Sequence, residues 1–90
     1  MILHYKNRNY ALTLLDGFYL TTVKPSKSGV IESILCALQD GRRVESFMQK
    51  TGIQFTVTYR GAEIRPEDVI SLLTLIEREN NKESTKWKQF

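Results

Sequence analysis

The first 24 residues alternate apolar and polar positions between two turn signals. The segment Lys6-Asn7-Arg8-Asn9 is polar, and Asp16-Gly17 is a dipeptide in which both residues tolerate a positive φ. Alternation with a period of two on either side of such turns is typical of antiparallel strands. The pattern therefore predicts a three-stranded antiparallel meander over residues 1–24.

Pairing outward from the two turns predicts which face of the meander each residue occupies. The second turn places Leu15 opposite Phe18, and the first places Tyr5 opposite Tyr10. The predicted inward set is Leu3, Tyr5, Tyr10, Leu12, Leu14, Tyr19 and Val23. The predicted open face holds Ala11, Thr13, Leu15, Phe18 and Leu20. A register error of one residue would exchange these two faces, because side chains alternate along a strand.

Helical spacing replaces the alternation after the loop at residues 24–29. The first helical stripe consists of Val30, Ile31, Ile34, Leu35 and Leu38. Ser28 is predicted as its N-cap, and Gly41 as the left-handed residue that follows its C-terminus. A shorter helix follows, with a stripe of Val44, Phe47 and Met48, and it is predicted to end at Gly52.

One more strand and one more helix complete the predicted fold. Residues 53–59 alternate strictly and predict a strand, which residues 60–63 turn. Pro66 is placed in the first turn of a helix with a wide apolar stripe of Val69, Ile70, Leu72, Leu73 and Ile76. The order β-β-β-α-α-β-α predicts an α+β fold, in which a four-stranded, mainly antiparallel sheet has helices packed on one face. Residues 1–79 are predicted to form a single domain, and residues 80–90 a polar C-terminal tail or a helix extension.

Composition narrows the classes of function. The chain has 90 residues, within reach of the roughly 100–200 typical of one domain. Thirteen basic and ten acidic residues give a net charge of +3. The single cysteine, Cys36, excludes an intrachain disulfide and favours the cytoplasm. No apolar run of about 20 residues predicts a membrane span, and the first residues do not resemble a secretory signal.

Catalytic and metal-binding chemistry is not expected. His4 is the only histidine, and Cys36 is expected to be a buried, inert thiol of the first helix. Acid–base and nucleophilic catalysis need partners that this composition hardly offers, and a zinc site needs more nitrogen and sulfur ligands. We therefore expect a protein that is not an enzyme and uses no cofactor or metal.

Two surfaces remain as candidate binding sites. The candidate protein-binding residues are Leu15, Phe18 and Leu20 on the open sheet face, Arg60 at its rim, and Trp87 and Phe90 in the tail. An alternative is that the tail folds back and Trp87 covers the open face. The candidate nucleic-acid-binding residues are Lys6, Arg8, Lys24, Lys27, Arg42, Arg43 and Lys50.

The sequence therefore predicts a small binding protein that occupies a surface on a macromolecular partner. Another protein is the expected partner, as for the inhibitors and adaptors that mobile elements such as phages encode. The alternative is a nucleic-acid-binding protein that uses the N-terminal basic loops and the helix at Arg42 and Arg43. A third interpretation is a homo-oligomer whose open sheet face is its own interface.

Overall fold

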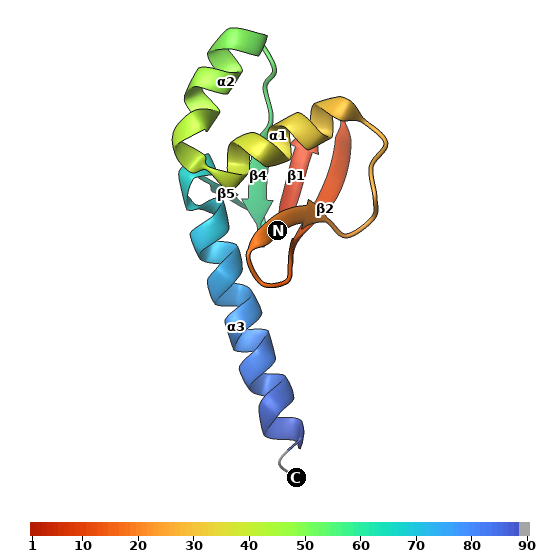
Figure 1. The fold of residues 1–90 in the computed structure, drawn as a ribbon, viewed down its shortest axis with the longest axis vertical. Coiled ribbons are helices and arrows are strands. Elements are labelled where there is room, and N and C mark those ends of the chain that lie inside the picture. Colours follow the sequence, from red (N-terminus) through yellow and green to blue (C-terminus); the bar gives the residue numbers. More distant parts are fainter. Residues whose placement is uncertain (89–90) are drawn as a thin grey trace.

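The protein folds as an α+β structure with a five-stranded antiparallel sheet (Figure 1). The structure is a computed structural model that describes the backbone of residues 1–88 and the side chains of residues 1–79. The strands are β1 (Ile2–Tyr5), β2 (Arg8–Leu15), β3 (Tyr19–Thr22), β4 (Thr56–Tyr59) and β5 (Ala62–Ile64). Their order across the sheet is β3-β2-β1-β4-β5. The predicted fold class is confirmed, with one strand more than the four expected.

The helices follow the predicted order. They are α1 (Gly29–Gln39), α2 (Val44–Thr51) and α3 (Val69–Lys88). Short 3-10 turns, η1 (Gly41–Arg43) and η2 (Pro66–Asp68), precede α2 and α3. Beyond its first turns, α3 runs away from the sheet as a single helix (Figure 1). No helix in the described part of the chain combines the length and the apolar character of a membrane span.

The turn between β1 and β2 is shorter than predicted. Lys6 and Asn7 have φ values of 45° and 63°, so these two residues alone form the turn. Tyr5 therefore pairs with Arg8, and Leu3 with Tyr10. The predicted pairing of Tyr5 with Tyr10 is wrong by two residues. The face assignments survive, because a shift of two leaves every side chain on its original face.

The register between β2 and β3 differs from the prediction by one residue. Asp16 and Gly17 adopt the expected positive φ values of 56° and 83°, and the Phe18 N–H donates to the Leu15 carbonyl at 3.3 Å. The ladder then pairs Leu15 with Tyr19, so Phe18 is an extra residue between the turn and the strand. The faces of β3 are exchanged as a result.

This exchange corrects the predicted positions of Leu20 and of two neighbours. Leu20 is only 2% exposed and lies in the core, whereas Tyr19 and Val23 are 53% and 60% exposed. Pairing outward from a two-residue turn had placed Leu20 outside and the other two inside. Three-residue hairpin loops are the next most common class after two-residue loops, and the dipeptide Asp16-Gly17 alone does not distinguish the two.

The fifth strand begins where the prediction had only a turn. Arg60 and Gly61, at φ values of 52° and 82°, form a second two-residue turn, and Tyr59 pairs with Ala62 across it. Strand β5 has three residues, which is too short to carry a recognisable alternation.

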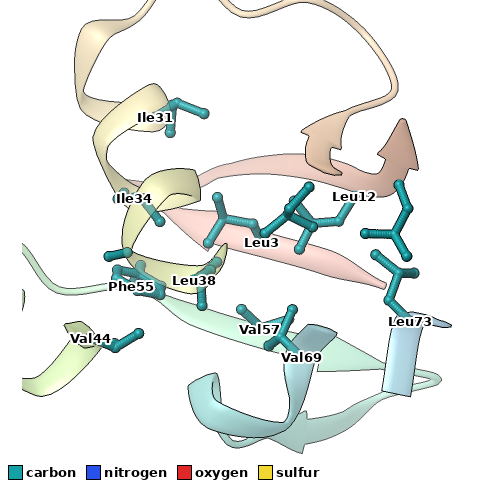
Figure 2. Packing of buried hydrophobic residues seen from close by; sticks show 13 residues of the cluster. Leu3, Leu12, Ile31, Ile34, Leu38, Val44, Phe55, Val57, Val69 and Leu73 are labelled. Carbon is teal, nitrogen blue, oxygen red and sulfur yellow. The ribbon is translucent and has the colours of Figure 1, made fainter. Parts of the chain in front are cut away.

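The core lies between the sheet and the helices. Ile31, Ile34 and Leu38 of α1 face Leu3 and Leu12 of the sheet (Figure 2). Val69 and Leu73 of α3 complete the cluster beside Val57. Leu3, on an inner strand, is fully buried. Burying each such side chain contributes about 1.5–3 kcal/mol, so this one layer supplies most of the stabilising free energy.

Helix ends show which local signals were interpreted correctly. Gly52 ends α2 with φ +72°, and its N–H donates to the Met48 carbonyl at 2.9 Å, as predicted. Ser28 occupies the N-cap position of α1, but its hydroxyl makes no capping bond. The role predicted for Gly41 is wrong, because Asp40 ends α1 in an extended conformation. A Cβ at Gly41 would lie 2.5 Å from the Glu67 Cα, so a glycine is needed where η1 meets η2.

Two side chains satisfy backbone groups that the ladder leaves unpaired. The Gln39 side chain of α1 accepts from the Leu20 N–H at 2.6 Å and donates to the Phe18 carbonyl at 2.8 Å. Because β3 is an edge strand, this amide replaces the neighbour that the strand lacks. The Glu77 carboxylate of α3 accepts from the Leu14 N–H at 3.1 Å, where β2 extends past β1.

Candidate docking surface

The outer face of the β2–β3 hairpin is apolar and exposed. Leu15 and Tyr19 pair across the strands and are 56% and 53% exposed, and Phe18 beside them is 68% exposed. Val23, 60% exposed, continues the ladder by donating its N–H to the Ala11 carbonyl at 2.8 Å. We call Leu15, Phe18, Tyr19 and Val23 the hairpin surface. In the side chains that the structure describes, only Leu75 is a further large hydrophobic residue of comparable exposure.

The strand segments that carry the hairpin surface contain no charged residue, and two carboxylates lie beside it. Asp16 forms the turn between Leu15 and Phe18, and the Glu77 carboxylate of α3 accepts from the Thr13 hydroxyl at 3.0 Å. Residues 9–15 and 18–23 include no Asp, Glu, Lys or Arg. Thr13 and Thr21 pair between its two apolar rows. A shallow hollow of about 290 Å³ lies at one end, with Ala11 and Val23 among its lining residues and Lys24 at its margin. Charge is depleted in the same way at the centres of protein interfaces.

Local chemistry holds this surface in place. The left-handed Asp16 and Gly17 set the tight turn, and the Gln39 amide holds the Phe18 carbonyl and the Leu20 N–H. Leu20 then anchors the strand in the core. A surface whose backbone is held before binding loses less conformational entropy when a partner docks.

The predicted protein-binding residues separate into three groups. Leu15 and Phe18 are exposed as predicted, whereas Leu20 is buried and leaves the set. Arg60 lies in the turn between β4 and β5, with its guanidinium 5.3 Å from the centre of the Tyr59 ring. Strands β1 and β4 separate this turn from β2, so Arg60 does not join the hairpin surface.

Trp87 and Phe90 are the two predicted protein-binding residues of the C-terminal region. Trp87 belongs to α3, but its side chain lies outside the described residues, and Phe90 lies outside them entirely.

Sequence reasoning missed Tyr19 and Val23 as surface residues. Both were predicted to face inward because the strand was paired directly from the Asp16-Gly17 turn. The signal in the sequence was Leu20, because a leucine is buried more often than a tyrosine. The prediction had placed Tyr19 inward and Leu20 outward.

The predicted basic residues do not form one cluster. Lys6 and Arg8 flank the first turn, and Lys24 lies at the same end of the sheet because β3 is antiparallel to β2. Lys27 follows in the loop before α1, and all four are exposed. The Lys6 ammonium lies 5.5 Å from the centre of the Tyr5 ring.

The other three basic residues lie on the α1–α2 side of the fold. Arg42 and Arg43 reach the same carboxylate, that of Asp40, at 3.8 and 3.5 Å. Lys50 is exposed in the last turn of α2.

A polar row crosses the outer face of the inner strands. The Nδ1 atom of His4 lies 2.7 Å from the Asn9 Oδ1, and its Nε2 lies 2.6 Å from the Thr58 Oγ1. A hydroxyl, an imidazole and an amide in this order resemble the series of nucleophile, base and orienting group. Here the three residues come from β2, β1 and β4, and they tie these strands together.

The row lies on strands inside the sheet, and His4 also lines a hollow with Phe55 and Thr56. The N–H groups of an inner strand lie in the plane of the sheet and donate to the neighbouring strands, so they do not point at an oxyanion above His4. Among the described residues, no three His, Cys, Asp or Glu side chains come together as a metal site requires. Cys36 is exposed, and the expectation that it is buried is wrong.

Comparison of the chain with protein-family models, with curated proteins and with solved structures gave no match.

Proposed function

We propose that the protein is a small binding protein whose hairpin surface docks on another protein. The observation that carries this proposal is the grouping of exposed apolar side chains at Leu15, Phe18, Tyr19 and Val23 on one hairpin whose strands contain no charged residue at positions 9–15 and 18–23. Contiguous exposed apolar surface is unfavourable in water, and on soluble proteins it commonly marks an interaction site. Aromatic residues such as Phe18 and Tyr19 are the type that anchors interfaces.

The size of the hairpin surface indicates what the partner has to cover. Eight residues of β2 extend about 26 Å, and the two strands of the hairpin are about 10 Å across. The resulting few hundred Å² are less than the roughly 800 Å² that each partner buries in a stable complex. The partner is therefore expected to contact the hairpin surface centrally and adjoining loops at its rim.

An inhibitor or adaptor acts by this kind of occupancy and needs no catalytic group of its own. In this proposal the protein is an inhibitor or adaptor of the kind that mobile elements encode, and it acts in the cytoplasm. Fold and size support only this general class, since one fold serves many functions.

Affinity capture from a nuclease-treated lysate tests the proposal. The wild-type protein is expected to retain one partner in stoichiometric amount, and Phe18→Asp to release it, because a carboxylate in an apolar contact lacks compensation. Leu75→Asp is the matched control, since Leu75 is an equally exposed apolar residue on α3, and it should retain the partner. Capture that survives Phe18→Asp and Tyr19→Asp would show that the hairpin surface is not the docking site.

Nucleic acid is the alternative partner. Lys6, Arg8 and Lys24 at one end of the sheet would contact phosphates, and the affinity would fall steeply with rising salt. Electrophoretic mobility shifts with DNA and RNA at low salt test this alternative, and the absence of any shift would exclude it. The absence of Lys and Arg between positions 9 and 23 favours the protein partner for the hairpin surface, because phosphate contacts dominate nucleic-acid affinity.

A further inference from the structure

The groove between α1 and α2 has a mixed lining of apolar, small polar and basic side chains, which are Ala37 and Phe47, Ser33, Cys36 and Ser46, and Arg43 and Lys50. It has a volume of about 460 Å³ and lies on the helical side of the fold, apart from the hairpin surface. Ala37, 6% exposed, and the half-buried Phe47 provide apolar lining. Arg43 and Lys50 line the same groove, and both are exposed.

Helical spacing explains how these residues come to share one groove. Phe47 and Lys50 are three positions apart and share one face of α2, and Arg43, which ends η1 and caps α2, lies one turn before Phe47. Seven residues of helix place the two cations about 10 Å apart along that face. On α1, the small side chain of Ala37 leaves space between the helices, which diverge from their junction (Figure 1).

The charge of the groove is positive. Its lining includes no Asp or Glu. Among the side chains of residues 1–79, the one carboxylate that contacts a cation of the groove is that of Asp40, which Arg43 shares with Arg42. One carboxylate between two guanidiniums leaves a local excess of positive charge, to which Lys50 adds. Glu45 lies on the opposite side of α2, about 160° around the helix from Phe47.

We propose that this groove receives an acidic segment of a partner protein. One large apolar side chain of the segment rests on Ala37 and Phe47, and flanking carboxylates face Arg43 and Lys50. Charge complementarity selects an anionic segment, and we assign the space beside Ala37 and Phe47 to an apolar side chain of a peptide. A nucleic acid could instead stack a base on Phe47, and an oligothymidine probe distinguishes the two. This second surface does not depend on the function proposed for the hairpin surface.

Amide NMR shifts of the intact protein test the proposal with three defined probes. The first is a 12-residue peptide in which glutamates flank a central pair of leucines. The second has glutamine in place of every glutamate, and the third is a 12-nucleotide oligothymidine. The acidic peptide is expected to bind with a Kd below about 1 mM at low salt and to shift α1 and α2 residues around Phe47. The other two probes are expected to bind at least about fivefold more weakly.

A charge-reversal pair separates the groove from the net charge of the protein. Lys50→Glu is expected to weaken binding of the acidic peptide by about fivefold, because one attractive contact becomes repulsive. Arg8→Glu changes the net charge equally at an exposed site of the sheet and should change the affinity less than about twofold.

Four results would each overturn the proposal: no binding at millimolar peptide, shifts centred outside α1 and α2, equal affinity for the glutamine peptide or the oligothymidine, and equal losses in the two variants. None of these results bears on the capture experiment with Phe18→Asp, so the two proposals fail separately.

Discussion

Replacing Leu20 by alanine, beside the same replacement of Tyr19, tests the register that defines the hairpin surface. The two residues are neighbours in β3 and occupy opposite faces. Leu20 is 2% exposed, and Tyr19 is 53% exposed. The register predicted from the Asp16-Gly17 turn alone would give these residues the opposite positions.

The expected effect of Leu20→Ala follows from its burial. Truncating a fully buried leucine costs about 2–5 kcal/mol, through lost burial and the cavity that remains. A chain of 90 residues has a total stability of about 5–13 kcal/mol, so this one change removes a large part of it. Tyr19→Ala should cost less than about 1 kcal/mol, because the ring leaves a half-exposed strand position.

Urea unfolding followed by far-ultraviolet circular dichroism measures both free energies of unfolding. With a slope of about 1–1.5 kcal/mol per molar urea, a loss of about 2–5 kcal/mol in Leu20→Ala should lower the midpoint by about 1.3–5 M. Thermal unfolding should show a fall of at least about 10 °C. A larger loss for Tyr19→Ala than for Leu20→Ala would refute the structural register, and with it the hairpin surface as defined.

Four further substitutions probe the turns, the helix junction and the edge strand of the fold. Gly41→Ala should lower the free energy of unfolding by about 1–3 kcal/mol, because its Cβ would lie 2.5 Å from the Glu67 Cα, and an unchanged urea midpoint would contradict that close approach. Gly17→Ala, at φ +83°, should lower stability by about 1 kcal/mol, whereas Gly29→Ala, with open space around its Cβ in the first turn of α1, should raise it by about 0.5 kcal/mol; the same sign for both would refute the conformational argument. Gln39→Ala should lower stability by about 1–3 kcal/mol and increase self-association in sedimentation velocity, because it opens the edge of β3; a stable monomer would show that the amide has no protective role.

Most of the fold could be predicted because the signals are local. The stripe on α1, the alternation that leads into β4 and the left-handed Gly52 each depend on residues within one turn or strand. Backbone sterics and side-chain periodicity determine such features directly, so the class and element order were confirmed. Strand β5 was not predicted, because three residues are too few to show an alternation of apolar and polar positions.

The candidate site could be predicted less well, because a strand face depends on register. Leu15 and Phe18 do not pair as predicted, but both are exposed, as predicted. Tyr19, Leu20 and Val23 follow the extra residue Phe18 and were all assigned to the wrong face. Whether one extra residue follows a turn is decided by which side chains the core accepts, and that core includes residues from three helices.

The sequence by itself determined the strands and helices of the first 79 residues apart from β5, the tight turn at Asp16-Gly17 and the apolar character of the hairpin. Only the tertiary structure decided which apolar residues face solvent. Leu20 enters the core beneath α1, the Gln39 amide holds the edge strand in that register, and Tyr19 and Val23 are left outside. The physical reason is that the free-energy difference between the two registers arises from packing and hydrogen bonds between residues distant in the chain. No turn signal at positions 16 and 17 contains that information.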